Sequence, residues 1–456
     1  MENRISNVLY SNYNTVHQTK SSEQNLAVSN PIRKEINNSA PRINFTSIKN
    51  SFRTELNKKE QEQYITLLNL VDKNTRKHLE ILLKSGILLN SESNDNSTVL
   101  DNLYKIGTTP RAEGLDNKGL LVDTITTISY PYVITQQFGD IPNHYRQKAL
   151  QANTENKSML IDSYFAHKDI DVDHSGTCVA ASIEFNLAEK MPAEFARFAE
   201  GLTSPNLSID KTIKLNNLAD HTLDAIWLLN AFEVPYEIDN YNYAKLKFAP
   251  DKNAIIRAQI QTTDRDSYER SPIDVLMQST FMQIGSQQTY NSLTDKRQGK
   301  FNQNDKGLIE FEKTFTESVV ENKNKLSITY QTVDENARLI GYETDFDTMK
   351  KHITSAIDQG ENVIIGYTQV DRDNIIVNGH EITIVNYEKD KDGKLTFICN
   401  DTDDNKSKPI KYSEDFLLPK IHHAALPQKI VENDLTFTPT WEDGLNMYKE
   451  TKNKAV

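Results

Sequence analysis

The sequence predicts an α+β fold, in which a helical half of the chain is followed by an antiparallel sheet. In the N-terminal part, apolar residues recur at intervals of three and four, the spacing of one helix face. Toward the C-terminus this pattern gives way to short alternating runs at residues 363–370, 380–387 and 394–400. The loops between these runs are rich in Asp, Asn, Lys and Gly, which indicates a meander of strands. Helices followed by strands in this way are typical of the α+β class.

The length of 456 residues indicates several structural units. Residues 1–52 are dense in Ser, Asn, Thr and Gln, and this composition predicts a disordered polar tail. Residues 53–115 have helical periodicity and form a helical accessory region. We expect the main domain over residues 116–430, with a polar insertion at about 285–325, and a C-terminal extension over residues 431–456.

Within the main domain, helix start signals are clearer than strand signals. Further helices are predicted to begin at Cys178, Pro192, Pro272 and Phe346. Proline suits the first position of a helix, and Ser271 with Asp274 gives a capping box for the third of these helices. Residues 120–134 are rich in Val, Ile and Tyr and predict a strand, which Pro131 restricts to a short or edge position.

Composition narrows the class of partner and the compartment. The net charge is −12, from 52 basic and 64 acidic residues, which argues against a nucleic-acid or anionic-membrane binder. The sequence contains no run of about 18 apolar residues, so it predicts no membrane span. Two cysteines, Cys178 and Cys399, do not predict a disulfide framework, so we expect a cytoplasmic protein. Because residues 1–7 lack the apolar core of a secretory signal, the alternative is an effector exported without a signal peptide.

The segment Gly176-Thr177-Cys178-Val179-Ala180-Ala181-Ser182 is the strongest candidate for chemistry. A cysteine in the first turn of a helix faces unpaired backbone N–H groups and the positive end of the helix dipole. Both favour the thiolate, which is the nucleophilic form. Gly176 has no side chain and lets the backbone approach a reacting carbonyl. The alternative interpretation is a cysteine that only fills space in an Ala-rich helix.

A base and an orienting group are available in the predicted sheet. His380 begins one strand and Asn400 ends the next, so in a hairpin the two side chains meet at one edge of the sheet. An amide bonded to an imidazole fixes its tautomer and aims its other nitrogen. We therefore expect Cys178 as nucleophile, His380 as base and then acid, and Asn400 as the orienting residue.

This ordered trio resembles the papain-like cysteine peptidases, whose helix opens with the very similar Gly-Ser-Cys-Trp-Ala-Phe-Ser. Residues 380–387 are similar to the family's His-x-x-x-x-Val-x-Tyr strand, and residues 360–367 to a lead-in of its bacteriocin-leader-processing branch. The resemblance covers about residues 165–425. It implies a papain-like fold, with the cysteine helix packed on the sheet that carries the histidine and asparagine. It also implies a cysteine peptidase that acts on a protein or peptide substrate without a cofactor or metal.

The chain departs from the family pattern before the cysteine. The family places a Gln there to complete the oxyanion hole, whereas this chain has Asp173 and His174. His174 offers a hydrogen-bond donor, and an ionised Asp173 would repel an oxyanion. In bacterial branches the orienting residue is often Asp, so Asp401 competes with Asn400. The alternatives are a transglutaminase-like or acyltransferase-like enzyme with the same triad, and a catalytically inactive papain-like binding module.

Two other groups are expected to be structural. Cys399 precedes Asn400 in its strand and so faces the other side, where core packing is expected. The pair His422-His423 has no second group of metal ligands nearby in the sequence, and we expect a surface or structural role for it.

Overall fold

The computed structural model describes most of the chain between residues 53 and 434. The described residues are 53–136, 176–220, 222–223, 226, 236–239, 241–263, 269–286, 288–292, 295–297, 307–308, 310–403 and 407–434. The predictions for residues 1–52, for Asp173 and His174, and for all but the first four residues of 431–456 lie outside these ranges. None of the helices within them has the length and apolarity needed to cross a bilayer.

The N-terminal part is a group of short helices with side-chain caps. They are α2 (Lys58–Leu70), α3 (Lys73–Lys84), η3 (Ile87–Leu89), α4 (Val99–Thr108), α5 (Asn117–Ser129) and η4 (Pro131–Val133). The side chains of Asn57, Asp72, Thr98 and Asp116 accept hydrogen bonds from the free N–H groups in the first turns of the four α-helices. The apolar face of each helix then packs on its neighbours, with α4 in contact with α2 and α5.

The strand predicted over residues 120–134 is wrong, because most of this segment is helix α5 followed by the turn η4. Its β-branched residues suit a strand, but the segment is buried on nearly all sides within the helical layer, and tertiary packing overrides the local preference. Two of its threonines satisfy their hydroxyls within the helix: Thr124 Oγ1 donates to the Leu120 carbonyl and Thr126 Oγ1 to the Val122 carbonyl, each at 2.7 Å.

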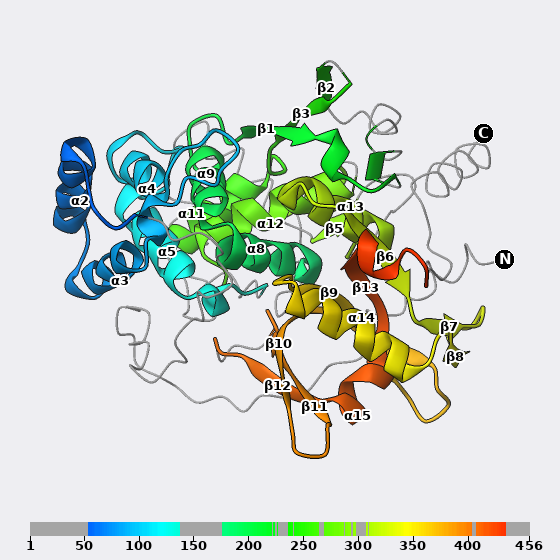
Figure 1. Ribbon diagram of the computed structural model, residues 1–456. Coiled ribbons are helices and arrows are strands. Elements are labelled where there is room, and N and C mark those ends of the chain that lie inside the picture. The colour runs from blue at the N-terminus through cyan, green and yellow to red at the C-terminus, as the bar shows by residue number, and fades with distance from the viewer. Residues whose placement is uncertain are drawn as a thin grey trace, which may run out of the picture.

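A second group of helices packs against the first. These are α8 (Cys178–Lys190), α9 (Pro192–Leu202), α11 (Ala254–Thr263), α12 (Pro272–Gly285) and α13 (Glu310–Glu321). The helix starts predicted at Cys178, Pro192 and Pro272 are confirmed. Helix α12 is almost entirely buried and contacts each of the other four (Figure 1). Helix α13 lies in the segment predicted as a polar insertion, yet its described side chains are buried.

The main sheet has six antiparallel strands in the order β12-β11-β10-β9-β13-β6. Their bounds are β6 (Lys325–Thr329), β9 (Val363–Val370), β10 (Ile376–Lys389), β11 (Leu395–Asn400), β12 (Ile410–Ser413) and β13 (Ile421–Pro427). The predicted meander is therefore confirmed in β9, β10 and β11, and it continues into β12. The chain is an α+β protein, as its sequence predicts.

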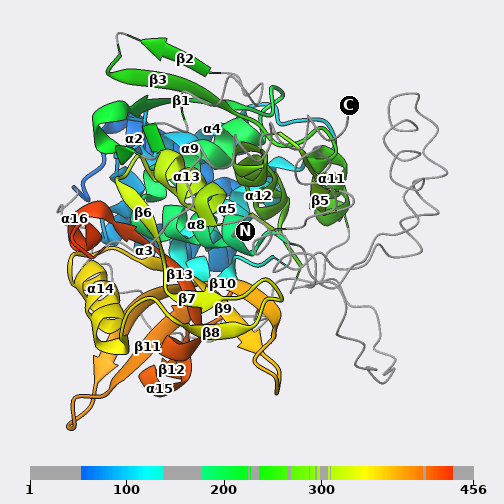
Figure 2. The ribbon, with the colours of Figure 1, turned by 90° about the vertical axis from the view of Figure 1, so that its right-hand side faces the viewer.

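The two faces of the sheet belong to different cores. In β9, Ile364 packs into the core that contains α8, whereas Val363 and Ile365 pack with α14 (Phe346–Asp358) on the other side. This follows from the alternation of side chains along a strand. Figure 2 shows the sheet between α14 and the helical half of the molecule.

The remaining elements are short. A small sheet is made by β1 (Ile209–Lys214), β3 (Tyr243–Phe248) and β2 (Tyr236–Asp239), in that order. Two hairpins are β4 (Tyr290–Asn291) with β5 (Lys296–Arg297), and β7 (Gln331–Val333) with β8 (Leu339–Tyr342). Single turns are η5 (Leu215–Asn217), α15 (Glu414–Leu417), η7 (Leu418–Lys420) and α16 (Gln428–Val431).

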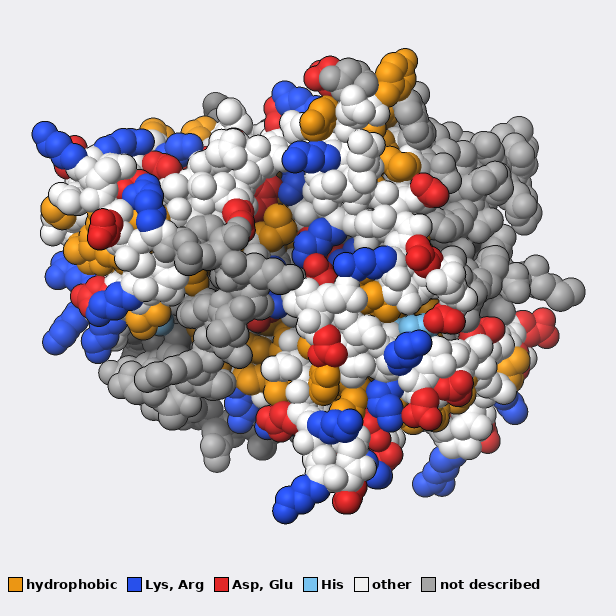
Figure 3. Space-filling view, in the orientation of Figure 1, with side chains coloured by type: hydrophobic (Ala, Val, Ile, Leu, Met, Phe, Trp, Pro, Cys, Tyr) orange, Lys and Arg blue, Asp and Glu red, His pale blue; other side chains and the backbone are white. Residues whose placement is uncertain are grey.

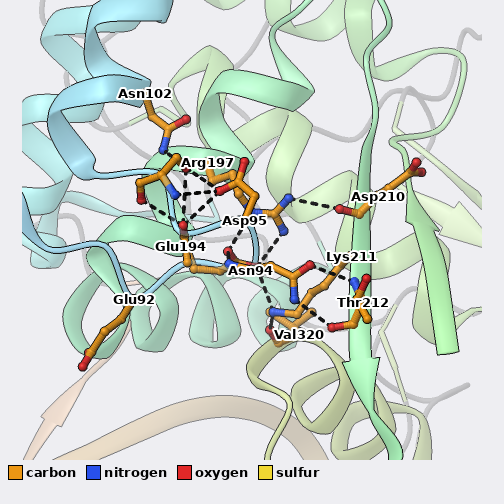
Figure 4. Close-up of polar contacts among 12 residues, drawn as sticks. Glu92, Asn94, Asp95, Asn102, Glu194, Arg197, Asp210, Lys211, Thr212 and Val320 are labelled. Carbon is orange, nitrogen blue, oxygen red and sulfur yellow. Dashed lines mark hydrogen bonds and ion pairs between the residues drawn. The ribbon is translucent and has the colours of Figure 1, made fainter. Parts of the chain in front are cut away.

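The larger hydrophobic core runs without a break from α2 through α13, so residue 115 does not mark a gap in packing. A polar network centred on the buried Glu194 adds to this connection (Figure 4). The backbone N–H of Asn94 donates to Glu194 Oε2 at 2.8 Å, and the Asn94 amide donates to the Thr212 carbonyl at 2.7 Å. Glu194 also pairs with Arg197 at 2.8 Å and with Lys211 at 2.9 Å. One buried carboxylate thus joins the loop before α4 to α9 and β1.

Candidate active site

Cys178 is the first residue of α8 and lies where the helical half meets the sheet. Its neighbours Val179, Ala180 and Ala181 are buried, while Cys178 itself is partly exposed. The small alanines let α8 approach β10 and β9, with which it is in contact. The first turn of the helix presents backbone N–H groups that have no partner within the helix. The thiol is therefore set at the positive end of α8 and is open to a reactant.

The imidazole of His380 joins this cysteine to an acid. His380 Nε2 lies 2.7 Å from Asp401 Oδ1, and Cys178 is close enough to the same ring to help raise its pKa. Because Nε2 is taken by the carboxylate, Nδ1 remains for the sulfur. The side chains of His380 and Asp401 are 14% and 16% exposed, so the pair is shielded from water without being sealed off. Cys178, His380 and Asp401 thus form a connected row from helix to sheet.

The charges in this row stabilise one another. Burial disfavours the charged imidazolium, but the Asp401 carboxylate and the hydrogen bond to it outweigh this effect, and with a smaller contribution from Cys178 they raise the pKa of His380 well above its ordinary value. Burial likewise disfavours the Asp401 carboxylate, and the nearby His380 more than offsets it, so the pKa of Asp401 is lowered. The arrangement favours an ion pair between acid and imidazolium.

The orienting residue predicted as Asn400 is replaced in this geometry by its neighbour Asp401. The strand pairing explains the difference: Thr383 pairs with Asn400, and His380 lies three positions further along β10 (383 − 380). His380 is therefore opposite the chain that follows β11, where Asp401 begins a turn and accepts the N–H of Asp403 at 3.0 Å. Asn400 is buried, and among the described residues its side-chain nitrogen has no hydrogen-bond partner.

A chain of buried hydrogen bonds links the residue before Cys178 to the residue after Asp401. Thr177 Oγ1 donates to Gln278 Oε1 at 2.8 Å, and Gln278 Nε2 donates to the Thr135 carbonyl at 2.9 Å. Thr135 Oγ1 then donates to the Thr402 carbonyl at 3.0 Å. All four residues are buried. This chain connects the start of α8, helix α12 and the end of β11, and so fixes Cys178 relative to Asp401.

Sequence reasoning missed both glutamines of this neighbourhood. Gln278 lies inside α12 and has no local pattern that marks it. Gln136 donates its N–H to the Thr402 carbonyl at 3.0 Å and accepts from Thr402 Oγ1 at 3.1 Å. It precedes Cys178 by 42 positions (178 − 136), which is far outside the short interval in which a glutamine was sought. Only the folded chain brings it beside the residue that follows Asp401.

The turn before α8 is held by a further buried carboxylate. The N–H of Gly176 donates to Asp295 Oδ2, and Asp295 Oδ1 accepts from the Tyr290 hydroxyl at 2.8 Å.

Cys399, the other cysteine, is buried in the core that contains α14, where burial raises the pKa of its thiol. The structure therefore separates one accessible thiol from one that is enclosed.

No protein-family model, curated protein or solved structure matches this chain. The interpretation of the site therefore depends on its own geometry and on the motifs around Cys178 and His380.

Proposed function

We propose that this protein is a papain-like thiol hydrolase, most simply a cysteine peptidase, with Cys178 as nucleophile. The observation that supports the proposal best is the row Cys178–His380–Asp401, in which one imidazole pairs with a carboxylate and interacts with a thiol at a helix start. A thiol, a base and an orienting acid in this order are the components of nucleophilic acyl transfer. The placement of the thiol on the helical half, of His380 on an antiparallel sheet and of Asp401 directly after one of its strands also supports a papain-like arrangement.

In the proposed reaction, the Cys178 thiolate adds to the carbonyl carbon of an amide and forms a tetrahedral oxyanion. Backbone N–H groups in the first turn of α8 would donate to this charge. His380 gives its proton to the leaving amine as the C–N bond breaks, which leaves a thioester on Cys178. His380 then removes a proton from water and the resulting hydroxide attacks the thioester. The C–S bond breaks, the acid product leaves, and the Cys178 thiolate is restored beside protonated His380. Asp401 stabilises the imidazolium in both steps.

The test is hydrolysis of a mixed peptide library followed by mass spectrometry, together with labelling by peptide-like thiol electrophiles. We expect wild-type protein to cleave a subset of peptides and to be labelled on Cys178. Cys178→Ala should lose both properties. Cys399→Ala is the matched control, because it removes the other thiol of the chain and should keep both. A wild-type protein that neither cleaves nor is labelled, while folded, would leave a catalytically inactive binding module as the better description.

A transglutaminase-like or acyltransferase-like enzyme is the second candidate, and the carboxylate at the third position favours it. Such enzymes use the same thiol, imidazole and acid, but an amine replaces water in the second half of the reaction. Adding a primary amine to the peptide assay separates the two. If the amine is incorporated into product in place of hydrolysis, the acceptor is an amine; if hydrolysis continues unchanged, it is water.

A further inference from the structure

A second group of chemically active side chains lies between α13 and β13. It consists of Glu310, His422 and His423, all buried, and one ligand atom from each lies within 4.8 Å of the others. His422 Nε2 is 2.9 Å from Glu310 Oε1, and His423 Nδ1 is 4.0 Å from the same oxygen. Adjacent residues of a strand normally face opposite sides, but the pairing of β13 with β9 shifts register between Ile421 and His423. Such an irregularity re-aims side chains and allows both rings to approach Glu310.

The ring of His423 is held from its far side. Its Nε2 lies 3.4 Å from Glu381 Oε1 and contacts Lys313, whose amino group donates to Glu381 Oε2 at 3.1 Å. Lys313 and Glu381 together hold the ring so that Nδ1 is on the side of Glu310. Polar groups behind a metal-binding histidine orient its ring in this way. His423 Nδ1 is buried, with no hydrogen-bond partner among the described residues.

The backbone also makes room for this ring. A Cβ placed on Gly366 in β9 would lie 2.3 Å from His423 Cε1 and 2.5 Å from Nδ1. Only glycine therefore permits the ring to lie against the strand. The charges of Lys313 and Glu381 offset each other because the two side chains form an ion pair. The carboxylate of Glu310 therefore leaves one negative charge among the charged groups named here. A buried carboxylate beside two imidazoles is a donor set suited to zinc and similar ions.

We propose that Glu310, His422 Nε2 and His423 Nδ1 bind a divalent transition metal of the zinc class. In a tetrahedral site with bonds of about 2.0–2.1 Å, ligand atoms are roughly 3.3 Å apart, and the two distances to Glu310 Oε1 lie on either side of this value. The ion would join the start of α13 to β13 and has no step in the proposed hydrolysis. The sequence expectation of a structural role for the two histidines overlooked Glu310, which is 112 positions from His422.

The test uses the full chain without an affinity tag and with the substitution Cys178→Ala, so that a thiol–imidazole site cannot bind the ion. Co²⁺ is added to the metal-free protein, its absorption is followed, and Zn²⁺ is used to displace it. We expect one equivalent with the intense visible bands of tetrahedral cobalt, and a rise in melting temperature on adding Zn²⁺. In the same background Glu310→Gln and His423→Gln should lose the bands, and His352→Gln should keep them. His352 is a matched control because it is a buried histidine that contacts Tyr330 and Asp434 instead.

If the substituted proteins do not fold, X-ray absorption of the cobalt-loaded Cys178→Ala protein decides the matter, and two imidazoles and a carboxylate oxygen are expected. Failure to bind cobalt or zinc at one equivalent would overturn the proposal. So would binding that survives Glu310→Gln and His423→Gln, or that is lost with His380→Ala alone. Because every readout is taken without Cys178, none of these results depends on whether the protein is a hydrolase.

Discussion

The single hydrogen bond from His380 to Asp401 decides how the imidazole can serve as base and acid. It takes Nε2 and leaves Nδ1 for Cys178. A carboxylate in this position both fixes the tautomer and stabilises the charged ring. An amide at the same place would fix the tautomer without adding charge.

Replacing the carboxylate tests this role. Asp401→Asn should lower the rate of peptide hydrolysis, or of Cys178 labelling, by about 10²–10⁴-fold, because the imidazolium loses its counter-charge. Asn400→Ser should change the rate much less and mainly lower the melting temperature, since Asn400 is buried beside β10. Rates measured for both substituted proteins at one pH provide the comparison. A larger loss from Asn400→Ser than from Asp401→Asn would reverse the assignment.

The same pair makes stability depend on pH. The folded state raises the pKa of His380 well above 6.5, so its contribution is complete below 6.5 and is lost as pH rises through the raised value. The pKa of Asp401 is lowered from 3.8, so its contribution is present above 3.8 and is lost as pH falls through the lowered value. The excess stability of wild type over His380→Gln should therefore be largest at about pH 4–6.5 and shrink in alkaline buffer. Urea unfolding at about pH 5.5 and about pH 9.5 measures it. An excess that grows toward the higher pH would contradict the ion pair.

At the scale of elements, helix α12 holds the site together through Gln278. Its amide bridges Thr177 and Thr135, and its Nε2 also donates to Glu184 Oε2 at 2.9 Å. Removing this side chain leaves several buried polar groups unsatisfied, at about 1–3 kcal/mol each. Because these groups flank the nucleophile and the acid, their displacement changes the spacing of α8 and β11.

Gln278→Met should therefore lower kcat more than it raises KM, and should also lower the melting temperature. Gln278→Glu should be worse than Gln278→Met, since it places a second carboxylate beside Glu184. Gln283→Met, on the same helix, is the control and should leave kcat near that of wild type. Steady-state kinetics on a cleaved peptide separates the two constants. A kcat unaffected by Gln278→Met would show that this chain of hydrogen bonds is structural only.

Helices and strands marked by local signals could be predicted from the sequence, and those that depend on distant contacts could not. The starts of α8, α9 and α12 and the strands β9–β11 follow from caps, prolines and alternation, which are local signals. Helix α5 was mistaken for a strand because Val122, Ile125 and Ile128 favour strands when their surroundings are unknown. Helix α13 was missed because its charges suggest a surface, and their partners are distant: Lys313 pairs with Glu381, 68 positions away.

The candidate site was predictable to a similar degree. Cys178 is predictable because it stands at the start of a helix, and His380 because it opens the alternating run 380–387, although β10 itself begins at Ile376. The choice of Asp401 over Asn400 depends on the register of β10 with β11. A sequence does not determine the register of two strands to within one residue. Gln278 and the pairing of Glu310 with His422 depend on contacts between distant elements, and no local pattern marks them.

At the scale of the whole molecule, the N-terminal helices and the helices around Cys178 form one body. They share a continuous core and the network centred on Glu194. Burial disfavours the Glu194 carboxylate, but Arg197 and Lys211 lower its pKa to about 2. On the face shown in Figure 3, acidic and basic side chains are interspersed among uncharged ones. The ion pairs of Glu194 with Arg197 and Lys211, which help to join the two groups of helices, are therefore inside the molecule.

Glu194→Gln should destabilise the protein by about 3–5 kcal/mol, because it leaves the buried Arg197 and Lys211 without their shared carboxylate. The loss should reach both sides of the connection, so that probes in α4 and in α9 unfold together. Urea unfolding near neutral pH, followed by hydrogen exchange of the two helices, measures this. Two separate transitions, with α4 unfolding alone, would contradict a single body.

The central claim is that folding makes Cys178 a nucleophile by placing it against His380. The most direct measurement is the alkylation rate of each cysteine by a small neutral reagent, resolved by peptide mapping, in the native protein and in urea. We predict that native Cys178 reacts at least about tenfold faster than the same residue in the unfolded chain, that native Cys399 does not react, and that His380→Ala removes the acceleration. A native Cys178 that reacts no faster than in urea, or equally fast in folded His380→Ala, would contradict the account.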